Sequence, residues 1–191
     1  MRTAREGAQA LRDALREEGG TVAGLLVGAS VSDQNDASAT LDRPGPAQVA
    51  ATGPRARGRE LEYEVLLEMI LEGYRLHYDE PRLVRPGDDD LALLLGDQLY
   101  ALGLARLAAL GDLDAVAELA DVISLAAQAH SASDPDLAHA AWEAGTVSVG
   151  WGPSEDHRRA KERARGHEPG APDALRAAAM ARRDGAETPC L

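Results

Sequence analysis

Apolar side chains recur at helical spacing in the middle of the chain. From Leu61 to His77 they fall three and four residues apart, which places them on one face of a helix. The rest of that helix surface is acidic and is expected to face solvent through Glu60, Glu62, Glu64, Glu68 and Glu72. Acids near the amino end also suit the helix dipole. The pattern therefore predicts an amphipathic helix over residues 60–77.

The following stretch, Leu91 to Leu110, is apolar on several sides and predicts a core helix that its neighbours surround. Gly96 and Gly103 lie on one face of this helix, although glycine lowers helix propensity. Close approach of a second backbone would explain both glycines. One of the three aspartates at 88–90 is expected to cap the amino end, because a carboxylate can accept from the free amides of the first turn.

The length of this helix would also suit a bilayer, which requires about 20 apolar residues. However, Asp97, Gln98 and Arg106 interrupt it, and charged groups are costly in hydrocarbon. No transmembrane segment is therefore predicted. A further helix is expected after Asp112, with His130 near its end.

Weaker patterns flank these helices. A short helix is predicted over residues 4–18, and another over 135–144 that stops at Gly145. Residues 146–151 have β-like composition and are expected to be extended. The predicted fold is all-α, a small bundle of about four core helices with disordered polar tails. Its expected parts are a short helix and apolar segment at 1–27, a disordered linker at 28–59, the helical core at 60–151 and a loosely helical or disordered tail at 152–191.

Charge and cysteine usage narrow the function classes. Residues 60–151 contain 18 acidic side chains and four arginines, a balance of −14. A surface that follows phosphates needs clustered Lys and Arg, so nucleic-acid binding is not expected. Cys190 is the single cysteine, and one thiol cannot crosslink the fold. With no apolar run of signal length at the amino end, the predicted location is cytoplasmic.

One candidate for catalysis is a pair of carboxylates on a predicted helix. Glu118 and Asp121 form a Glu-x-x-Asp motif, which all-α nucleotide pyrophosphohydrolases combine with a Glu-x-x-Glu on a neighbouring helix. The neighbouring acids here, Glu64, Glu68 and Glu72, are spaced by four, so only half of that pattern is present. No motif for a nucleophile or a phosphate-binding glycine loop accompanies it.

A second candidate comes from residues 68–97. His77 is followed by Asp79, then by Arg85 with Gly87, and then by Gly96-Asp97 with Leu99 and Tyr100. This order resembles the trans-isoprenyl diphosphate (polyprenyl) synthases. In that family a helix ends in His and an aspartate-rich motif, an arginine pair follows, and the next helix contains Ala-Gly-Asp.

The resemblance implies a site for an isoprenoid diphosphate at His77, Asp79, Arg82 and Arg85, with Asp79 and Glu80 as Mg²⁺ ligands. Catalysis in the family requires several carboxylates to hold the ions that stabilise the departing diphosphate. Here Tyr78 to Arg82 occupy the place of the first aspartate motif and supply at most two carboxylates. The resemblance therefore implies a shortened relative that has lost prenyl transfer.

The sequence thus predicts a non-catalytic helical protein that resembles part of a polyprenyl diphosphate synthase and acts as an accessory or interaction subunit, with no cofactor. The alternative is a Mg²⁺-dependent enzyme on a diphosphate substrate, either a divergent prenyl transferase or a nucleotide pyrophosphohydrolase. A core of about 90 residues is marginal alone. A protein partner or self-association through the helical core is expected to cover the helix at 91–110.

Overall fold

A computed structural model describes residues 1–26 and 42–186, and within these ranges the regular structure is helical without strands. This confirms the all-α class, but the prediction of about four core helices is too low. The α-helices are α1 (Ala4–Glu18), α2 (Gly20–Gly24), α4 (Pro46–Ala51), α5 (Glu60–Tyr78), α6 (Asp89–Ala109), α7 (Leu113–Ser131), α8 (Pro135–Trp151), α9 (Glu155–Arg165) and α10 (Ala171–Ala186), with a 3₁₀ turn, η1, at Pro54–Ala56.

The chain divides into two compact units. The N-terminal unit contains Met1–Gln48 and Arg59–Gly111, and the C-terminal unit contains Val49–Gly58 and Asp112–Leu191. The core predicted at 60–151 therefore contributes to both units.

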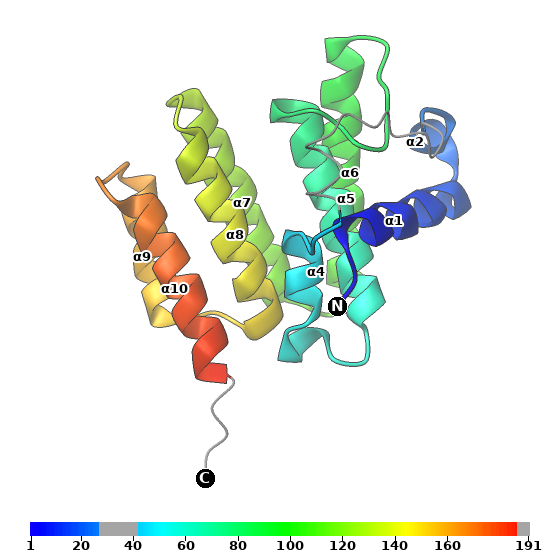
Figure 1. Cartoon of the computed structure of the whole chain (residues 1–191). Helices are drawn as coiled ribbons and strands as arrows, with labels where there is room; N and C mark the ends of the chain where they lie inside the picture. The colour runs from blue at the N-terminus through cyan, green and yellow to red at the C-terminus, as the bar shows by residue number, and fades with distance from the viewer. Residues whose placement is uncertain (27–41, 187–191) are drawn as a thin grey trace. The chain divides into compact units, whose positions relative to one another are not determined.

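The N-terminal unit is built around α5, with α6 along one side of it and α1 across another (Figure 1). Thr3 begins α1 in a capping box, accepting from the Glu6 amide while the Glu6 carboxylate accepts from the Thr3 amide. Asp88 begins α6 and accepts from the Leu91 amide at 2.8 Å, as the sequence predicts for one of the three aspartates. Apolar side chains from α1, α5 and α6 meet in the core, and the largest buried ones include Leu11, Leu15, Met69, Leu95 and Leu99.

Small residues bring α5 and α6 close together. A Cβ added at Gly96 would lie 2.6 Å from the His77 ring, and one added at Gly73 would lie 2.9 Å from the Gly96 carbonyl oxygen. A Cβ at Gly103 would lie 2.5 Å from Cγ1 of Ile70. The spacing of Gly96 and Gly103 therefore serves the close backbone approach that the sequence predicts.

The outer side of α6 differs from the prediction that neighbours surround this helix. Leu93 is 46% exposed and Leu94 is 67% exposed. Among the described helices, α6 alone is long and apolar enough to cross a membrane by length and composition, and 28% of its most apolar window is buried. Core helices of soluble proteins pass the same test.

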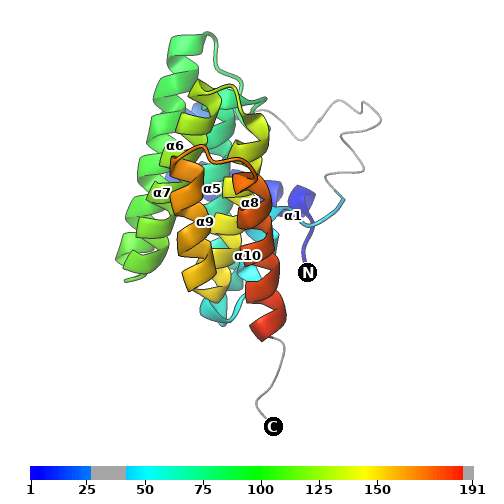
Figure 2. The same ribbon diagram turned by 90° about the vertical axis from the view of Figure 1, so that its left-hand side faces the viewer.

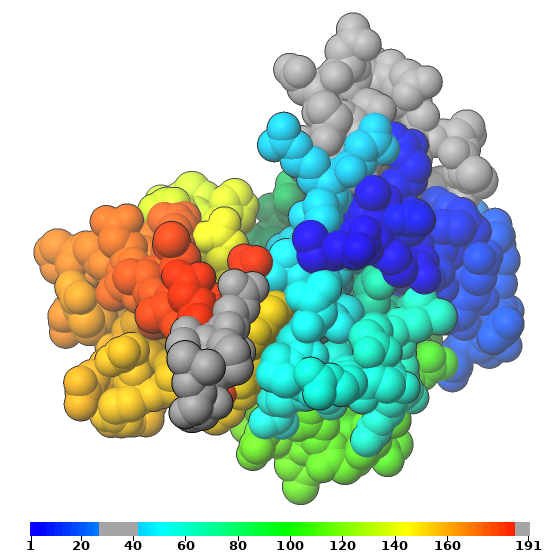
Figure 3. All heavy atoms as spheres, turned by 60° about the horizontal axis from the view of Figure 1, so that its bottom comes forward, coloured from blue at the N-terminus to red at the C-terminus, as the bar shows by residue number. Residues whose placement is uncertain are grey.

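The C-terminal unit contains two antiparallel helix pairs. Helix α8 packs between α7 and α10, and α9 lies beside α10 (Figure 2). Helix α10, coloured orange to red in Figure 3, packs directly against α8 and α9, whose surface is gold. Three side chains begin helices here by accepting from amides of the first turn: Asp112 for α7, Asp134 for α8 and Ser154 for α9.

Three regions differ from the sequence-based expectation. The described part of the predicted linker, 42–59, contains α4 and η1 rather than disordered chain, whereas residues 28–41 of that linker lie outside the described residues. The tail at 152–191, predicted to be loosely helical or disordered, forms the regular helices α9 and α10 as far as Ala186. The segment predicted to be extended, 146–151, continues α8 as helix to Trp151, so Gly145 does not end that helix.

Candidate functional site

The residues that carry the family resemblance meet where α5 and α6 cross. The His77 ring stacks on Tyr100, with centroids 5.3 Å apart and planes inclined by 6°. Its Nε2 lies 3.2 Å from Oδ1 of Asp97, whose side chain is 72% exposed. The resemblance thus joins positions that are neighbours in space, although their contacts serve helix packing equally well.

The other predicted ligand residues lie in the loop after α5. Asp79 caps α5, is exposed and accepts from the Glu80 amide at 2.8 Å. Arg85 is exposed and donates to the Pro81 carbonyl at 2.7 Å. Arg82 is partly buried, and its pKa is lowered, first by burial and then by the charge of Arg75. These three side chains therefore have separate local roles.

The proposed metal ligands Asp79 and Glu80 do not belong to a larger ligand set. Within residues 1–26 and 42–186, no group of three or more His, Cys, Asp or Glu side chains has an arrangement that could hold a metal ion. Mg²⁺ binds through carboxylates with near-octahedral geometry. The described carboxylates therefore offer no such cage at this loop.

A row of buried glutamates on α5 corrects the prediction of a solvated acidic face. Glu64, Glu68 and Glu72 are only 3%, 2% and 1% exposed. Gln48 of α4 donates from Nε2 to Oε1 of Glu64 at 3.3 Å and to Oε1 of Glu68 at 3.0 Å. The Gln48 amide group therefore connects two carboxylates that successive turns of α5 present on one face.

Cations and a backbone amide complete this row. Oε1 of Glu72 accepts from the Leu83 amide at 2.6 Å, and its Oε2 lies 3.3 Å from Nη1 of Arg75. Oε1 of Glu64 lies 3.2 Å from Nε of Arg2. Buried charges require such partners. The row thus fixes α4, α5 and the loop around Leu83 to each other, and its oxygens are engaged internally.

The pKa of Glu64 gives a testable pH dependence. Burial raises this pKa above its ordinary value of 4.5, more than Gln48 and Arg2 lower it. A raised folded-state pKa gives a contribution to stability that is complete below pH 4.5 and lost as pH rises through the folded value. We therefore compare the change in unfolding free energy that Glu64→Gln causes at two pH values. This change is expected to be more favourable at pH 7 than at pH 4, by about 1 kcal/mol.

Urea denaturation across this pH range measures the effect, and Glu62→Gln is the control because Glu62 is exposed on the same helix. Parallel stability curves for Glu64→Gln and the unmodified chain would show that the buried carboxylate is not penalised.

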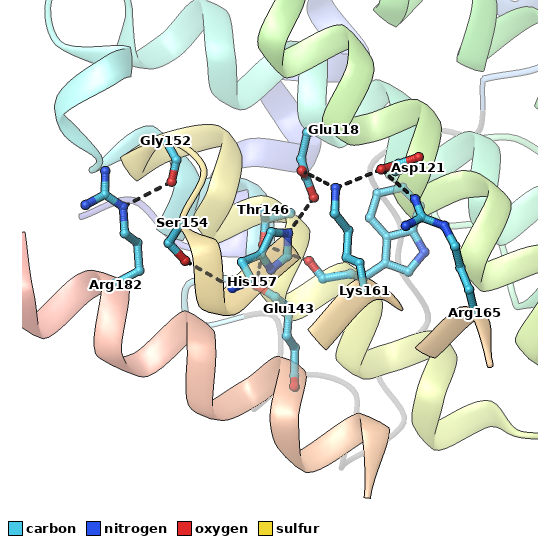
Figure 4. A network of polar contacts seen from close by, with 11 residues as sticks. Glu118, Asp121, Glu143, Thr146, Gly152, Ser154, His157, Lys161, Arg165 and Arg182 are labelled. Carbon is cyan, nitrogen blue, oxygen red and sulfur yellow. Dashed lines mark hydrogen bonds and ion pairs between the residues drawn. The ribbon is translucent and has the colours of Figure 1, made fainter. Parts of the chain in front are cut away.

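The C-terminal unit holds a second polar network, between α7 and α9 (Figure 4). Glu118 is 8% exposed and accepts from His157 Nε2 and from Lys161 Nζ, each at 2.7 Å. The same Lys161 Nζ donates to Oδ2 of Asp121 at 2.8 Å, and Arg165 approaches that oxygen at 2.8 Å. Both carboxylates of the Glu-x-x-Asp motif therefore bind cationic side chains of α9.

The electrostatics of this network favour the charged forms. Burial opposes ionisation of Glu118, but hydrogen bonds and charges from His157 and Lys161 outweigh it, and the Glu118 pKa is lowered. Burial likewise opposes the charge of Lys161, but Asp121 and Glu118 raise its pKa overall. The two carboxylates of α7 thus face the side chains of His157, Lys161 and Arg165 from α9.

Sequence reasoning found the two carboxylates of this network but not their partners. His157, Lys161 and Arg165 are spaced by four, which places them on one face of α9. That spacing was an available signal, since it matches the Glu-x-x-Asp pair on α7. One atom remains unusual: the Nδ1 of His157 is buried and has no hydrogen-bond partner among the described residues.

Comparison with known proteins adds no further assignment. The chain matches no model of a protein family, no curated protein and no solved structure. The relationship to the polyprenyl diphosphate synthases therefore stays a prediction from residues 68–97.

Proposed function

We propose that this chain is a non-catalytic helical protein that works as an accessory or interaction subunit. The observation that carries the proposal is the one-sided packing of α6. Covering a helix this apolar lowers its free energy. Leu93 and Leu94, however, face solvent and are 46% and 67% exposed. A partner chain would cover them.

The carboxylates support the same conclusion. A diphosphate enzyme needs carboxylates whose oxygens are free to hold Mg²⁺. In the N-terminal unit, the oxygens of Glu64, Glu68 and Glu72 meet Gln48, arginines and an amide. In the C-terminal unit, Glu118 and Asp121 are bound by the cations of α9. Binding Mg²⁺ at either place would require breaking these internal contacts.

The outer face of α6 has the pattern of a contact surface. Leu94, Ala101, Ala105 and Ala108 are exposed and lie on the side of the helix opposite Leu99, which is completely buried. Leucine and alanine at helical spacing form a surface against which another helix can pack. The proposed role therefore uses α6 as the interaction helix.

Isothermal titration calorimetry with Mg²⁺ and a long allylic diphosphate tests the proposal against its enzymatic alternative. We expect no saturable Mg²⁺-dependent heat, because the carboxylates of the two buried networks are already engaged. Saturable heat that disappears in Asp79→Asn would overturn the non-catalytic role. Light scattering on the same sample distinguishes self-association from a requirement for a different chain.

A further inference from the structure

One end of the α5–α6 pair exposes apolar and acidic side chains together. Tyr78, Leu93 and Leu94 are 41%, 46% and 67% exposed. The contact between Gly96 and the His77 ring brings the end of α5 to the beginning of α6, at the top of the view in Figure 1. We define the tip patch as the side chains of Tyr78, Asp79, Glu80, Asp89, Asp90, Leu93, Leu94 and Asp97.

The tip patch is strongly negative. Residues 78–97 contain six acids and two arginines, a balance of −4. Of these arginines, Arg85 donates to a backbone carbonyl and Arg82 is partly buried near Glu68 and Glu72. In the described ranges, Asp89 and Asp90 form no ion pair with a Lys or Arg. Their charge is therefore available to a partner.

Helix geometry places the apolar and acidic groups where one partner can contact both. Asp90, Leu94, Asp97 and Ala101 follow at intervals of four, three and four, so they form a row along one face of α6. Each of the four is exposed. An elongated partner lying along this row would meet leucine and carboxylate on successive turns.

We propose that the tip patch binds a cationic amphipathic helix of a partner protein. Leucines of that helix would cover Tyr78, Leu93 and Leu94, while its Lys or Arg side chains would pair with Asp90 and Asp97. This inference rests on the proposed interaction role and names the chemistry of the partner. A second copy of the patch would instead oppose carboxylate to carboxylate, which is unfavourable.

The experiment uses the full chain and two labelled probe peptides of about 20 residues, a length that forms a helix about 30 Å long. Both peptides have leucines on one face, and the other face is lysine in one and glutamate in the other. Fluorescence anisotropy measures binding at low and high salt. We expect saturable binding of the lysine peptide alone, weakened by salt because exposed charges are screened.

Matched variants locate the binding. Leu94→Ser is expected to raise the Kd by about tenfold, and Asp90→Asn to raise it several-fold with a smaller salt dependence. Leu113→Ser and Glu62→Gln are the controls, because both positions are exposed and lie outside the tip patch. Their Kd is expected to equal that of the unmodified chain.

Three results would overturn the inference: equal binding of both peptides, an unchanged Kd in Leu94→Ser, or a dimer of this chain that requires Leu94 and excludes the lysine peptide. The last result would leave the proposed interaction role intact with a second copy as occupant. Loss of the interaction role itself would appear separately, as Mg²⁺-dependent diphosphate binding in the calorimeter.

Discussion

Replacing Glu118 with Ala is expected to lower the free energy of unfolding of the C-terminal unit by about 3–5 kcal/mol, the usual cost of removing one partner from a buried ion pair. The carboxylate accepts from both His157 and Lys161, and all three residues are less than a tenth exposed. Without Glu118, the Lys161 ammonium keeps only the half-exposed Asp121 as partner. Detachment of α9 from α7 would then allow water to hydrate the Lys161 ammonium.

Hydrogen exchange and urea denaturation check this result together. The amides of α9 are expected to lose protection in Glu118→Ala before those of α7 do. Arg158→Ala is the matched control, because its ion pairs with Glu155 and Glu162 are exposed and internal to α9, where such pairs contribute little. Unchanged protection of α9 in Glu118→Ala would mean that apolar contacts, rather than the ion network, hold this helix.

The same carboxylate sets a pH dependence opposite to that of Glu64. The lowered pKa of Glu118 means that its contribution is present above the ordinary value of 4.5 and lost as pH falls through the lower folded value. Glu64 has a raised pKa and favours the folded state at acidic pH. Lowering the pH should therefore weaken the contacts of α9. It should also remove the cost of burying the ionised Glu64 in the row on α5.

Local patterns were sufficient for the central helices. The apolar spacing predicted α5 and α6 to within a few residues, and the cap of α6 by one of the aspartates at 88–90 followed from side-chain chemistry that acts within one turn. The close approach at Gly96 and Gly103 was also predicted, because two costly glycines on one helix face require a packing reason.

The polar contacts that the sequence did not predict join residues that are far apart in the chain. Glutamates spaced by four look like a solvated face until Gln48, which lies 16 residues from Glu64 and 20 from Glu68, is known to bind them. Likewise, α9 has too few apolar residues to predict docking, and its His157 finds Glu118 at a separation of 39 residues. No local pattern contains either pairing.

The carboxyl-terminal half of α8 shows tertiary packing overriding local propensity. Residues 146–149 read Thr-Val-Ser-Val, which favours strand because β-branched side chains are restricted in helices. In the structure these residues are helical and buried, and the Thr146 hydroxyl donates to the Trp142 carbonyl at 2.9 Å. Burial between neighbouring helices therefore outweighs a preference that is worth only a few tenths of a kcal/mol per residue.

This buried half of α8 also contains the least tolerant glycine contact. A Cβ at Gly150 would lie 2.4 Å from the Ala50 carbonyl oxygen, and one at Gly53 would lie 2.2 Å from the Gly150 carbonyl oxygen. Both obstacles are backbone atoms, which a rotamer change cannot move. Gly150→Ala is therefore expected to lower the free energy of unfolding by about 3 kcal/mol, the upper end of the cost of overpacking.

Urea denaturation of Gly150→Ala, Gly53→Ala and the double variant measures this contact. The double variant is expected to cost less than the sum, because either methyl group alone already separates the two backbones. Gly185→Ala is the control: Gly185 is helical with nothing within 4 Å of an added Cβ, so alanine there should stabilise the chain by up to about 1 kcal/mol. If Gly150→Ala were as well tolerated as Gly185→Ala, the backbone of residues 50–53 could not pack closely against α8.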